Sequence, residues 1–597
     1  MTSLIHNKIT LYILPFLLGI ISSYSLPPYN FFLINFFTFP SLLIFLISNS
    51  YRGKFSYFSI GWMFGFGYFL SNLYWIVNSL SFDDIFKTLI PFALILIPLF
   101  LGLFYGFATL GSSLLNLKKN FSSILIFSIL LSLIEYIRSI IFGGFPWNLI
   151  VYSLSENLSS IQILSYVGTY SLNLLVITVF LIPSIFFFNY KQNIKFFSLF
   201  LTLIILSINY FIGNLIIKKS EKLEEVKLDF IIKIISPKID INRFFEDENP
   251  KKIFLDLVKI SEPNSSKKTI FIFPEGILSS IYLQDIKKYH QIISDNFSDN
   301  HKIILGINSY EDSKIYNSLV VLDNNANILA KYNKNKLVPF GEFLPYENFF
   351  KKLGFKKITQ GYLSFSSSDK RHLININSFN FLPLICYEII YSGKIKKKYD
   401  EDFDFILNIS EDGWFGNSVG PHQHFSHSIF RSIEEGKNVI RSTNNGISAF
   451  INSNGQIIKR IISTKKGFIE LESFKKAKKT HFSSYGNKIF FYFIINISED
   501  GWFGASVGPH QHFSHSIFRS IEEGKNLFRS ANNGISAHID ASGRVINSLK
   551  STEKGFIEIR NILKKKNTFF ISFGNKIFFY FLIFYISFIF FLKKKKI

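Results

Sequence analysis

Three short segments contain side chains that together can perform covalent catalysis. Glu275 lies in FIFPEG, Lys334 in YNKNKLVPFGEF, and Cys386, the only cysteine of the chain, in LPLICYEII. A free thiol has a pKa of about 8.5, so a cysteine nucleophile needs a base or a cation beside it near neutral pH. Glu275 is suited to accept the thiol proton and Lys334 to stabilise a developing oxyanion. These residue types therefore predict a nucleophilic role for Cys386.

Each of these residues has a more ordinary explanation when it is taken alone. A single cysteine after an apolar run is more often a core residue, and a lysine in a polar loop is usually solvated. Glu275 and Cys386, however, each follow a short apolar run. A side chain at the end of a buried strand often points into a cleft, which favours the catalytic interpretation.

The region from about 226 to 475 has the pattern of an α/β domain. Short apolar runs alternate there with polar segments that are compatible with helices. The runs cover 226–235, 268–273, 302–307, 317–323, 381–386 and 403–409. We therefore expect buried strands between helical layers, in a domain large enough to have its own core.

The first third of the chain consists mainly of long apolar stretches, in a protein of 597 residues that is 48% hydrophobic. Seven of these stretches are long enough to cross a hydrocarbon core of about 30 Å. The first stretch is followed by a second apolar stretch, and no small-residue cleavage site lies after it. This pattern predicts an uncleaved anchor and not a signal peptide. The seven stretches, and an eighth near the C-terminus, lie near 9–26, 31–48, 55–78, 88–112, 121–142, 161–188, 196–217 and 577–592.

The cations of the short loops predict the orientation of these spans, because cytoplasmic loops are enriched in lysine and arginine. In the loops between these cation-rich loops, Lys87 is the only lysine or arginine. We expect both termini in the cytoplasm and the domain from about 218 onward on the outer side of the inner membrane. The cations in alternate loops are Arg52, Lys54, Lys118, Lys119, Lys191 and Lys195, and the terminal lysines are 593–596.

The net charge of +23 is interpreted mainly as solvation and membrane orientation. The lysines are scattered or lie beside apolar segments and do not form a stripe with aromatic residues, so we expect no nucleic-acid partner. A single cysteine also excludes an internal disulfide framework and a Cys-rich metal site. The histidines of HQHFSH at 422–427 have zinc-compatible spacing without an evident carboxylate or cysteine partner. A structural or helix-start role is therefore favoured over a metal site.

Glu135 and Arg138 lie one helical turn apart in the fifth apolar stretch. The simpler interpretation is an ion pair that neutralises itself close to the membrane interface. The alternative is a polar contribution to a site that opens between the membrane and the outer domain.

Residues 408–495 recur at 496–583 with a constant offset of 88. Over 408–438 the two copies differ only at Asn417, which is Ala505 in the second copy. Because the repeat begins after Cys386, the second copy has no nucleophile. The first copy is expected to complete the catalytic domain, since its shorter link to the cysteine strand costs less loop entropy.

The repeat also sets the expected domain boundaries. The apolar run 489–495, at the end of the first copy, is too short to cross a bilayer. We expect a seven-span membrane domain, a catalytic domain, a duplicated segment and a final helix with a lysine-rich tail, at 1–217, 218–485, 486–576 and 577–597.

The three chemical motifs resemble those of a known family. PEG, YNKNKLVPFGE and ICYE are similar to the Glu, Lys and Cys motifs of the nitrilase superfamily, and specifically of the apolipoprotein N-acyltransferase family. GGFPWN resembles that family's outer loop before its sixth span, and DGWFGNSVGPHQHF and RSTNNGISA resemble its post-cysteine loop and strand. The resemblance implies a multi-span α-helical membrane domain plus an extracytoplasmic α/β nitrilase-like domain, an αββα sandwich inserted before the eighth span.

The resemblance also implies roles for individual residues. Glu275 would be the general base, Lys334 the oxyanion stabiliser and Cys386 the acyl-carrying nucleophile, with no metal and no cofactor. Glu342 and Glu388 would be the carboxylates that orient Lys334, and the amide of Tyr387 would contribute to the oxyanion hole. The aromatic residues that line the acyl and lipid entry would be Trp147, Tyr387, Trp414 and Phe415.

Two positions depart from the family pattern. Lys336 stands where the family commonly has His, and SPKIDINRFF at 236–245 replaces a segment that usually carries Gln, Asn and Trp. Outer tryptophans are also common interface anchors, which is a second interpretation of the aromatic residues.

The reaction that the resemblance implies is ping-pong acyl transfer. A membrane phospholipid would donate its acyl group to Cys386, and the α-amine of a diacylglyceryl-cysteine at a lipoprotein N-terminus would accept it. Two alternatives remain at this point: a membrane-tethered amidase or nitrilase that transfers to water, and a pseudoenzyme, disabled by the duplication, that only binds lipid.

Overall fold

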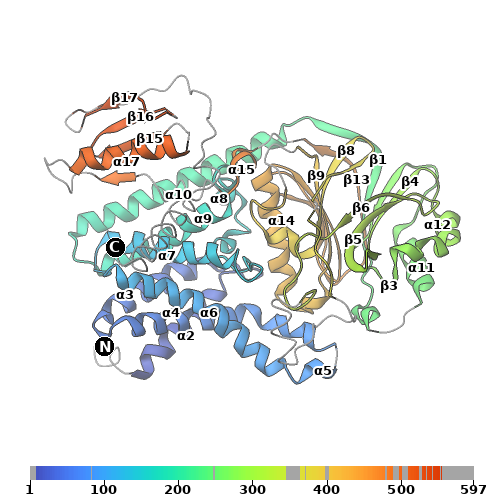
Figure 1. The fold of residues 1–597 in the computed structure, drawn as a ribbon, viewed down its shortest axis with the longest axis horizontal. Helices are drawn as coiled ribbons and strands as arrows, with labels where there is room; N and C mark the ends of the chain where they lie inside the picture. Colours follow the sequence, from blue (N-terminus) through green and yellow to red (C-terminus); the bar gives the residue numbers. More distant parts are fainter. Residues whose placement is uncertain are drawn as a thin grey trace, which may run out of the picture. The chain divides into compact units, whose positions relative to one another are not determined.

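The structure is a computed structural model, and it divides the chain into two compact units, 1–490 and 491–597 (Figure 1). The first unit contains a helical part and an α/β part, and the second unit contains the second copy of the repeat. The residues that the structure describes are 8–82, 84–245, 249–343, 364–369, 371–396, 402–476, 480–487, 497–499, 508–523, 527–532, 534–540, 542–550, 553 and 555.

Each of the seven apolar stretches of the first third forms a helix. Small residues let these helices approach closely: a Cβ on Gly19 would lie 2.0 Å from the carbonyl oxygen of Phe64 in the neighbouring helix. The helices are α2 (Lys8–Ser23), α3 (Asn35–Ser48), α4 (Lys54–Leu73), α6 (Ile90–Leu114), α7 (Phe121–Arg138), α9 (Leu164–Leu181) and α10 (Gln192–Glu221).

Four segments among the described residues are long and apolar enough to cross a membrane, namely Ile90–Leu114, Phe121–Arg138, Leu164–Phe187 and Gln192–Glu221. Thr10–Ser23 and Phe32–Ser48 are shorter apolar helices. The expected eighth span at 577–592 lies outside the described residues. The helical part is therefore a membrane domain, and the number of crossings stays a prediction.

The α/β part contains two sheets, and all six apolar runs of the sequence are strands in them. The first sheet has the order β13-β1-β2-β4-β5-β6, with β3 paired to β4, and the second has the order β12-β11-β10-β9-β8-β7. The strands of the first sheet are β1 (Glu225–Ser236), β2 (Thr269–Ile272), β3 (Leu278–Tyr282), β4 (His301–Glu311), β5 (Lys314–Leu322), β6 (Ile328–Asn333) and β13 (Gly467–Lys475). Those of the second are β7 (Ile374–Ile376), β8 (Phe379–Ile385), β9 (Phe405–Glu411), β10 (Asn438–Asn444), β11 (Ser448–Ile451) and β12 (Ile457–Ile461).

The two sheets pack face to face between helices, as expected for an αββα sandwich (Figure 1). The hydroxyl of Ser442 in β10 donates to the carbonyl oxygens of Ile235 and Ile272 in the opposite sheet, at 2.8 and 3.0 Å. Helices α11 (Pro250–Ser261) and α12 (His290–Asn296) cover the first sheet, and α14 (Gly420–Glu435) covers the second. The predicted fold class is confirmed.

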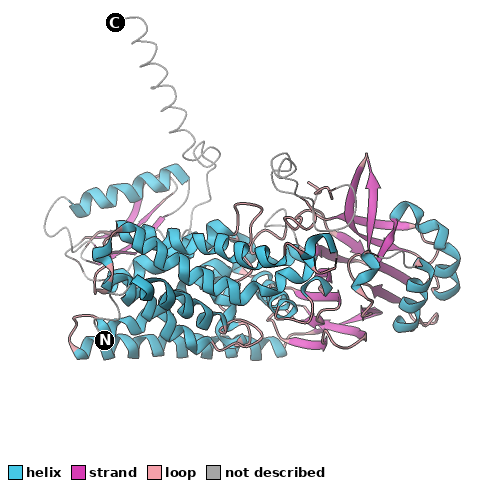
Figure 2. Ribbon diagram, turned by 90° about the horizontal axis from the view of Figure 1, so that it is seen from below, coloured by secondary structure: helices cyan, strands magenta, loops and turns pink. Residues whose placement is uncertain are grey.

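Helix α14 also joins the α/β part to the helical part, which adjoin in Figure 2. Helix α9 is interrupted at Gly168, whose φ of +76° is left-handed. The amide and the hydroxyl of Thr169, which follows the interruption, both donate to the Glu434 carboxylate of α14 at 2.6 Å. A carboxylate at the start of a helical segment satisfies amides that would otherwise be unpaired. A side chain of α14, in the α/β part, therefore caps the second segment of α9, in the membrane domain.

The first copy of the repeat contributes the second half of β9, the strands β10 to β13 and helix α14 to the α/β part. Strand β9 pairs in parallel with β8, the strand that leads into Cys386, with Ile385 opposite Ile409. The first copy therefore lies against the cysteine strand, and the expectation that it completes the catalytic domain stays a prediction.

The second copy repeats the same local structure in the second unit. Its elements have the sheet order β14-β15-β16-β17, and the register shift between β11 and β12 recurs between β16 and β17. The elements are β14 (Ile497–Glu499), α17 (Gly508–Glu523), β15 (Leu527–Asn532), β16 (Ser536–Ile539) and β17 (Val545–Leu549).

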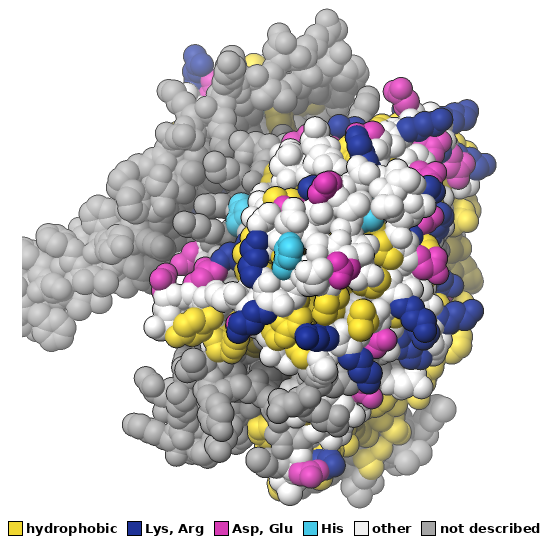
Figure 3. Space-filling model, turned by 90° about the vertical axis from the view of Figure 1, so that its right-hand side faces the viewer, with side chains coloured by type: hydrophobic (Ala, Val, Ile, Leu, Met, Phe, Trp, Pro, Cys, Tyr) yellow, Lys and Arg dark blue, Asp and Glu magenta, His cyan; other side chains and the backbone are white. Residues whose placement is uncertain are grey.

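The surface of the α/β part contrasts with that of the membrane helices. On the face in Figure 3, Lys and Arg side chains are interspersed with Asp and Glu, which is typical of a solvated surface. Helix α10 instead exposes large apolar side chains, among them Phe197 at 63% and Phe211 at 63%. Apolar exposure of this extent is characteristic of a surface that faces lipid.

Candidate active site

Cys386 lies at a sharp turn between a buried strand and a short helix. Strand β8 ends at Ile385, and a 3-10 helix covers Cys386–Ile390. The φ of Cys386 is +49°, in the left-handed region that non-glycine residues rarely occupy. Backbone strain of this kind concentrates at functional sites, because the surrounding structure must hold it in place. The side chain is nearly buried, at 8% exposure.

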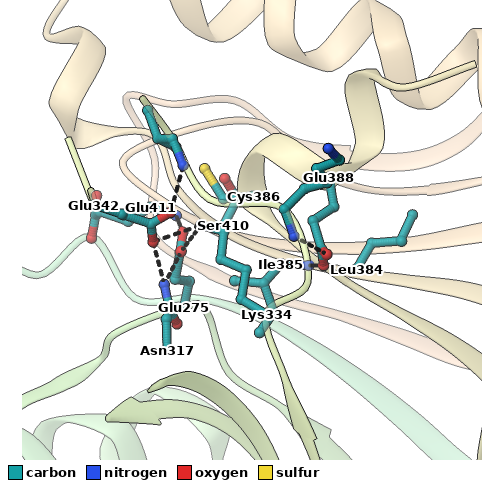
Figure 4. Close-up of polar contacts among 12 residues, drawn as sticks. Glu275, Asn317, Lys334, Glu342, Leu384, Ile385, Cys386, Glu388, Ser410 and Glu411 are labelled. Atoms are coloured by element: carbon teal, nitrogen blue, oxygen red, sulfur yellow. Dashed lines mark hydrogen bonds and ion pairs between the residues drawn. The ribbon is translucent and has the colours of Figure 1, made fainter. Parts of the chain in front are cut away.

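Lys334 follows β6 and binds two carboxylates next to Cys386 (Figure 4). Its ammonium lies 3.0 Å from Oε1 of Glu275 and 2.9 Å from Oε1 of Glu342. The amide of Asn317 donates to the same two oxygens, at 2.7 and 2.9 Å. The network therefore fixes both carboxylates and the lysine in one arrangement.

Burial and neighbouring charges set the proton states of the nucleophile and the lysine. Burial raises the pKa of the Cys386 thiol well above its ordinary value, the charge of Glu275 raises it further, and Lys334 opposes the shift only in part. Burial alone would lower the pKa of Lys334, but Glu275 and Glu342 together raise it well above its ordinary value. The resting site therefore contains a neutral thiol beside a lysine cation.

Glu388 lies on the other side of Cys386 from Glu275 and Glu342 (Figure 4). It accepts hydrogen bonds from the backbone amides of Asn335, Lys336 and Ile385, at 2.9, 3.0 and 2.9 Å. It is fully buried. The expectation that Glu388 orients Lys334 is thus refined: Glu388 ties the backbone of the lysine loop to the strand that leads into the nucleophile.

Glu388 has two side-chain partners that were not among the predicted site residues. The hydroxyl of Tyr332 donates to both carboxylate oxygens at 2.9 and 3.0 Å, and the guanidinium of Arg371 lies 2.9 Å from Oε1. Tyr332 stands in the run YNKNK, two residues before Lys334, where the alternation of a strand predicts a side chain on the same face. Arg371 belongs to no motif, so the sequence offers no signal for it.

The end of β9 and the segment that follows it contact Glu275 and Cys386. The amide of Glu411 donates to Oε2 of Glu275 at 3.0 Å. His424 lies 2.9 Å from Asp412 through Nδ1 and 3.3 Å from the carbonyl oxygen of Cys386 through Nε2. Burial would raise the pKa of Asp412, but Arg441 and His424 hold it at about 2. The HQHFSH segment thus supports the backbone of the nucleophile, and among the described residues no group of acidic, His or Cys side chains has the arrangement of a metal site.

The loop after α7 brings Trp147 to the site. Its indole nitrogen donates to Oε1 of Gln423 at 2.9 Å, and its ring stacks on those of His424 and Tyr387, with centroids 5.2 and 6.5 Å apart. The phenol of Tyr387 donates to the carbonyl oxygen of Gly144 at 2.8 Å. The residue that follows the nucleophile is therefore tied to the membrane domain.

Trp414 and Phe415 lie in two different aromatic contacts. Phe415 meets Trp75 and Trp147 edge to face, at 4.7 and 5.5 Å between ring centroids. Trp414 instead contacts Phe244 at 5.1 Å, so SPKIDINRFF supplies its neighbour. Both rings are half-buried.

Glu135 and Arg138 are both fully buried, and their closest charged atoms are 3.9 Å apart. Glu135 accepts from Tyr105 at 2.8 Å, and Arg138 donates to the carbonyl oxygen of Phe145. The pair is thus an internal ion pair, and Arg138 also holds the loop that carries Trp147.

These features define the class of protein: a layered α/β enzyme with a strained cysteine beside a Glu-Lys pair, joined to a membrane domain. Two family models match the corresponding parts of the chain. The model for the apolipoprotein N-acyltransferase N-terminal domain matches residues 18–182, and the carbon-nitrogen hydrolase model matches residues 295–472.

Relatives extend the match over most of the chain. The apolipoprotein N-acyltransferase of Rhizobium rhizogenes is 30% identical over 507 residues, which cover 81% of this chain and 94% of the relative. The enzyme of that name from Rhizobium leguminosarum bv. trifolii is 31% identical and covers 76% and 88%. The chain belongs to the apolipoprotein N-acyltransferase family and is an acyltransferase.

Among solved structures, the chain resembles a CN-hydrolase superfamily protein of Xanthomonas campestris with an arsenic adduct in its active site. The two are 13% identical, the match covers 41% of this chain and 91% of that chain, and the TM-score is 0.30. A glutamine-dependent NAD+ synthetase of Acinetobacter baumannii matches with 16% identity, 43% and 48% coverage and a TM-score of 0.31.

Proposed function

We propose that the protein transfers a fatty acyl group from a membrane phospholipid, through a thioester on Cys386, to the N-terminal amine of a diacylglyceryl-cysteine lipoprotein. The observation that carries the proposal is the buried Glu275–Lys334–Glu342 network next to a cysteine held at a φ of +49°. Covalent catalysis divides the aminolysis of an unreactive ester into two easier steps. The acceptor is a lipoprotein and the donor a lipid, in keeping with the family.

In the first step the thiol of Cys386 gives its proton to Glu275 as its sulfur attacks the ester carbonyl carbon. The carbonyl electrons move to oxygen, and Lys334 together with the amide of Tyr387 stabilises that oxyanion. The C–O bond of the ester then breaks, and the leaving lysophospholipid takes the proton from Glu275. Because the resting thiol is neutral, proton transfer and attack are coupled, which requires the base to lie close by.

In the second step the neutral amine of the acceptor attacks the thioester. Glu275 accepts the proton of the attacking nitrogen, the same oxyanion forms, and the C–S bond breaks. The departing sulfur recovers a proton from Glu275, and the site returns to its resting state. One carboxylate thus serves both half-reactions.

Both substrates are lipids, which accounts for the membrane domain. We place the α/β part on the outer side of the inner membrane and both termini in the cytoplasm, because cations concentrate in alternate loops. Trp147, Trp414 and Phe415 line the route by which acyl chains reach Cys386. Outer tryptophans that only anchor the protein would instead contact headgroups rather than the chains.

Two alternative functions make different demands on this site. A membrane-tethered amidase would transfer the acyl group to water, and a pseudoenzyme would form no acyl-enzyme. The intact Glu-Lys-Cys arrangement opposes the pseudoenzyme. The hydrogen bond between Gly144, in the loop after α7, and Tyr387, the residue that follows Cys386, opposes the amidase because it ties the site to the membrane domain.

Purified protein incubated with phospholipid vesicles is expected to gain the mass of one acyl group, because the first step requires no acceptor. Intact-mass spectrometry reads this adduct, and neutral hydroxylamine removes it if it is a thioester. Cys386→Ala is the control and should remain unmodified. A folded wild-type protein that never acquires the adduct contradicts the proposal, and an adduct that is released only to water identifies the hydrolase.

A chain that lacks 496–583 is expected to keep acyl transfer within about threefold of the full chain, a difference under about 1 kcal/mol in the barrier. The first copy already pairs with the cysteine strand, and the deletion joins Ile495 to Phe584, which restores an uninterrupted apolar run for the last span. The assay compares acylation rates at equal membrane levels. A correctly inserted single-copy chain without activity would show that the second copy is needed.

A further inference from the structure

An exposed apolar loop lies where α7 leaves the membrane domain. Ile140, Ile141 and Phe142 are 44%, 37% and 54% exposed. Three consecutive exposed apolar side chains are unfavourable in water and favourable in contact with lipid chains. At the outer end of a membrane helix this loop therefore marks a place where lipid contacts the protein.

The same loop touches the two segments that build the active site. The phenol of Tyr391, five residues after Cys386, donates to the carbonyl oxygens of Gly143 and Gly144 at 2.9 and 3.0 Å. A Cβ on Gly143 would lie 3.0 Å from Cγ of Pro339 in the lysine loop. The apolar loop, the lysine loop and the segment after the nucleophile thus meet at one edge.

Two lysines project from that edge. Lys336 and Lys394 are both exposed, and the ammonium of Lys336 lies 5.8 Å from the centre of the Tyr391 ring. The backbones of the two lysines meet at one buried ion pair. The amide of Lys336 donates to Glu388, and Arg371, which pairs with Glu388, donates to the carbonyl oxygen of Lys394. In keeping with this arrangement, partial burial and, after it, the charge of Lys336 lower the pKa of Lys394. Within the described part of the chain, neither lysine forms an ion pair with a carboxylate.

A pair of repelling cations beside an exposed apolar loop is a site for an amphiphile with an anionic head. An anion between the ammonium groups would relieve their repulsion and make charge-assisted hydrogen bonds to both. The acyl chains of the same molecule would cover the apolar loop. We propose that Lys336 and Lys394 bind the phosphate of the phospholipid donor, so that its ester reaches Cys386 in a defined orientation.

This inference rests on the proposed function for the identity of the donor, and it adds the headgroup contact. It predicts that the two lysines govern donor binding and leave the chemistry at Cys386 unchanged. Backbone contacts of Lys336 support this separation, because its amide, which any replacement side chain keeps, is the part that binds Glu388.

The first test measures Cys386 acylation against the surface concentration of phosphatidylglycerol in vesicles. The double variant Lys336→Gln/Lys394→Gln is expected to need about tenfold more donor for half-maximal rate, while the rate at saturation stays within about twofold. Lys336→Arg/Lys394→Arg should recover most of the loss. Lys259→Gln, an exposed lysine of α11, is the matched control and should have no effect.

The second test does not depend on chemistry. In the Cys386→Ala protein, binding of dihexanoyl phosphatidylglycerol is measured by calorimetry with and without the double lysine substitution, and phosphate-free dihexanoylglycerol serves as the reference. Loss of binding to the phospholipid alone supports the phosphate site, even if the wild-type protein never acylates. Equal binding by both proteins overturns it, as does a double variant that loses only the saturated acylation rate.

Discussion

Glu275→Gln is expected to reduce acyl transfer by about 10²- to 10⁴-fold, the usual contribution of a general base, while Cys386 becomes easier to alkylate. After burial, the charge of Glu275 is the main cause that raises the pKa of the thiol. Removing this charge leaves the Lys334 cation in place, so the pKa of Cys386 falls and more thiolate is present at a given pH. Unfolding would also expose the buried thiol and abolish catalysis, so the comparison uses protein whose thermal-unfolding midpoint matches that of the wild type.

The measurement follows iodoacetamide labelling from pH 6 to 10 by intact mass, with acyl transfer assayed on the same preparations. The only cysteine is Cys386, so the label reports one site. Glu342→Gln is the matched variant, because it also removes a carboxylate from Lys334 but leaves the proton acceptor. Its labelling curve should move less and its activity should fall less. If labelling of Glu275→Gln rises at the same pH as in the wild type, or at a higher pH, then Glu275 does not raise the pKa of the thiol.

Much of this site follows from local patterns in the sequence. Cys386 and Glu275 each follow a short apolar run, and a run of this type becomes a buried strand whose end opens at the sheet edge. All six runs are strands, and the seven apolar stretches are helices. A long apolar run has few ways to bury its backbone and side chains, so its structure is determined locally.

The residues that complete the site cannot be predicted in this way. Asn317 bridges Glu275 and Glu342 from the start of β5, yet in the sequence it is only the polar end of an apolar run. The amide of Glu411, at the end of a strand of the second sheet, donates to Glu275, which follows a strand of the first sheet 136 residues earlier in the chain. Such contacts depend on how the two sheets pack, so the local spacing of residues in the sequence does not predict them.

The pairing of β1 with β13 has the same origin. Lys227 lies opposite Ser473, across almost the whole catalytic domain, so the strand that closes the first sheet comes from the repeated segment. The sequence indicates a strand-rich region there, but it gives neither the partner nor the antiparallel direction. Register over such a separation is set by the packing of both sheet faces.

Lys334→Met is expected to destabilise the α/β part by about 3–5 kcal/mol, because breaking a buried ion pair leaves charges without a counter-ion. Lys334 is 1% exposed, and Glu275 and Glu342 are 6% and 7% exposed. Without the ammonium these two carboxylates would share one water-poor site. Acylation of Cys386 should also fall by about 10²- to 10³-fold, the usual effect of losing an oxyanion donor.

The double variant Lys334→Met/Glu342→Gln separates these two effects. It removes one of the two negative charges, so the midpoint of thermal unfolding in detergent should recover most of what Lys334→Met loses, while acylation stays low because the oxyanion still has no cation. Glu342→Gln alone provides the baseline. Stability and acylation that recover together would show that Lys334 only neutralises the carboxylates, whereas recovery of stability alone requires that the ammonium acts on the reacting carbonyl. We expect recovery of stability alone. The Lys334 ammonium lies 3.0 Å from Glu275 and 2.9 Å from Glu342, and these two contacts fix it beside Cys386, where a preorganised charge stabilises the transition state most strongly.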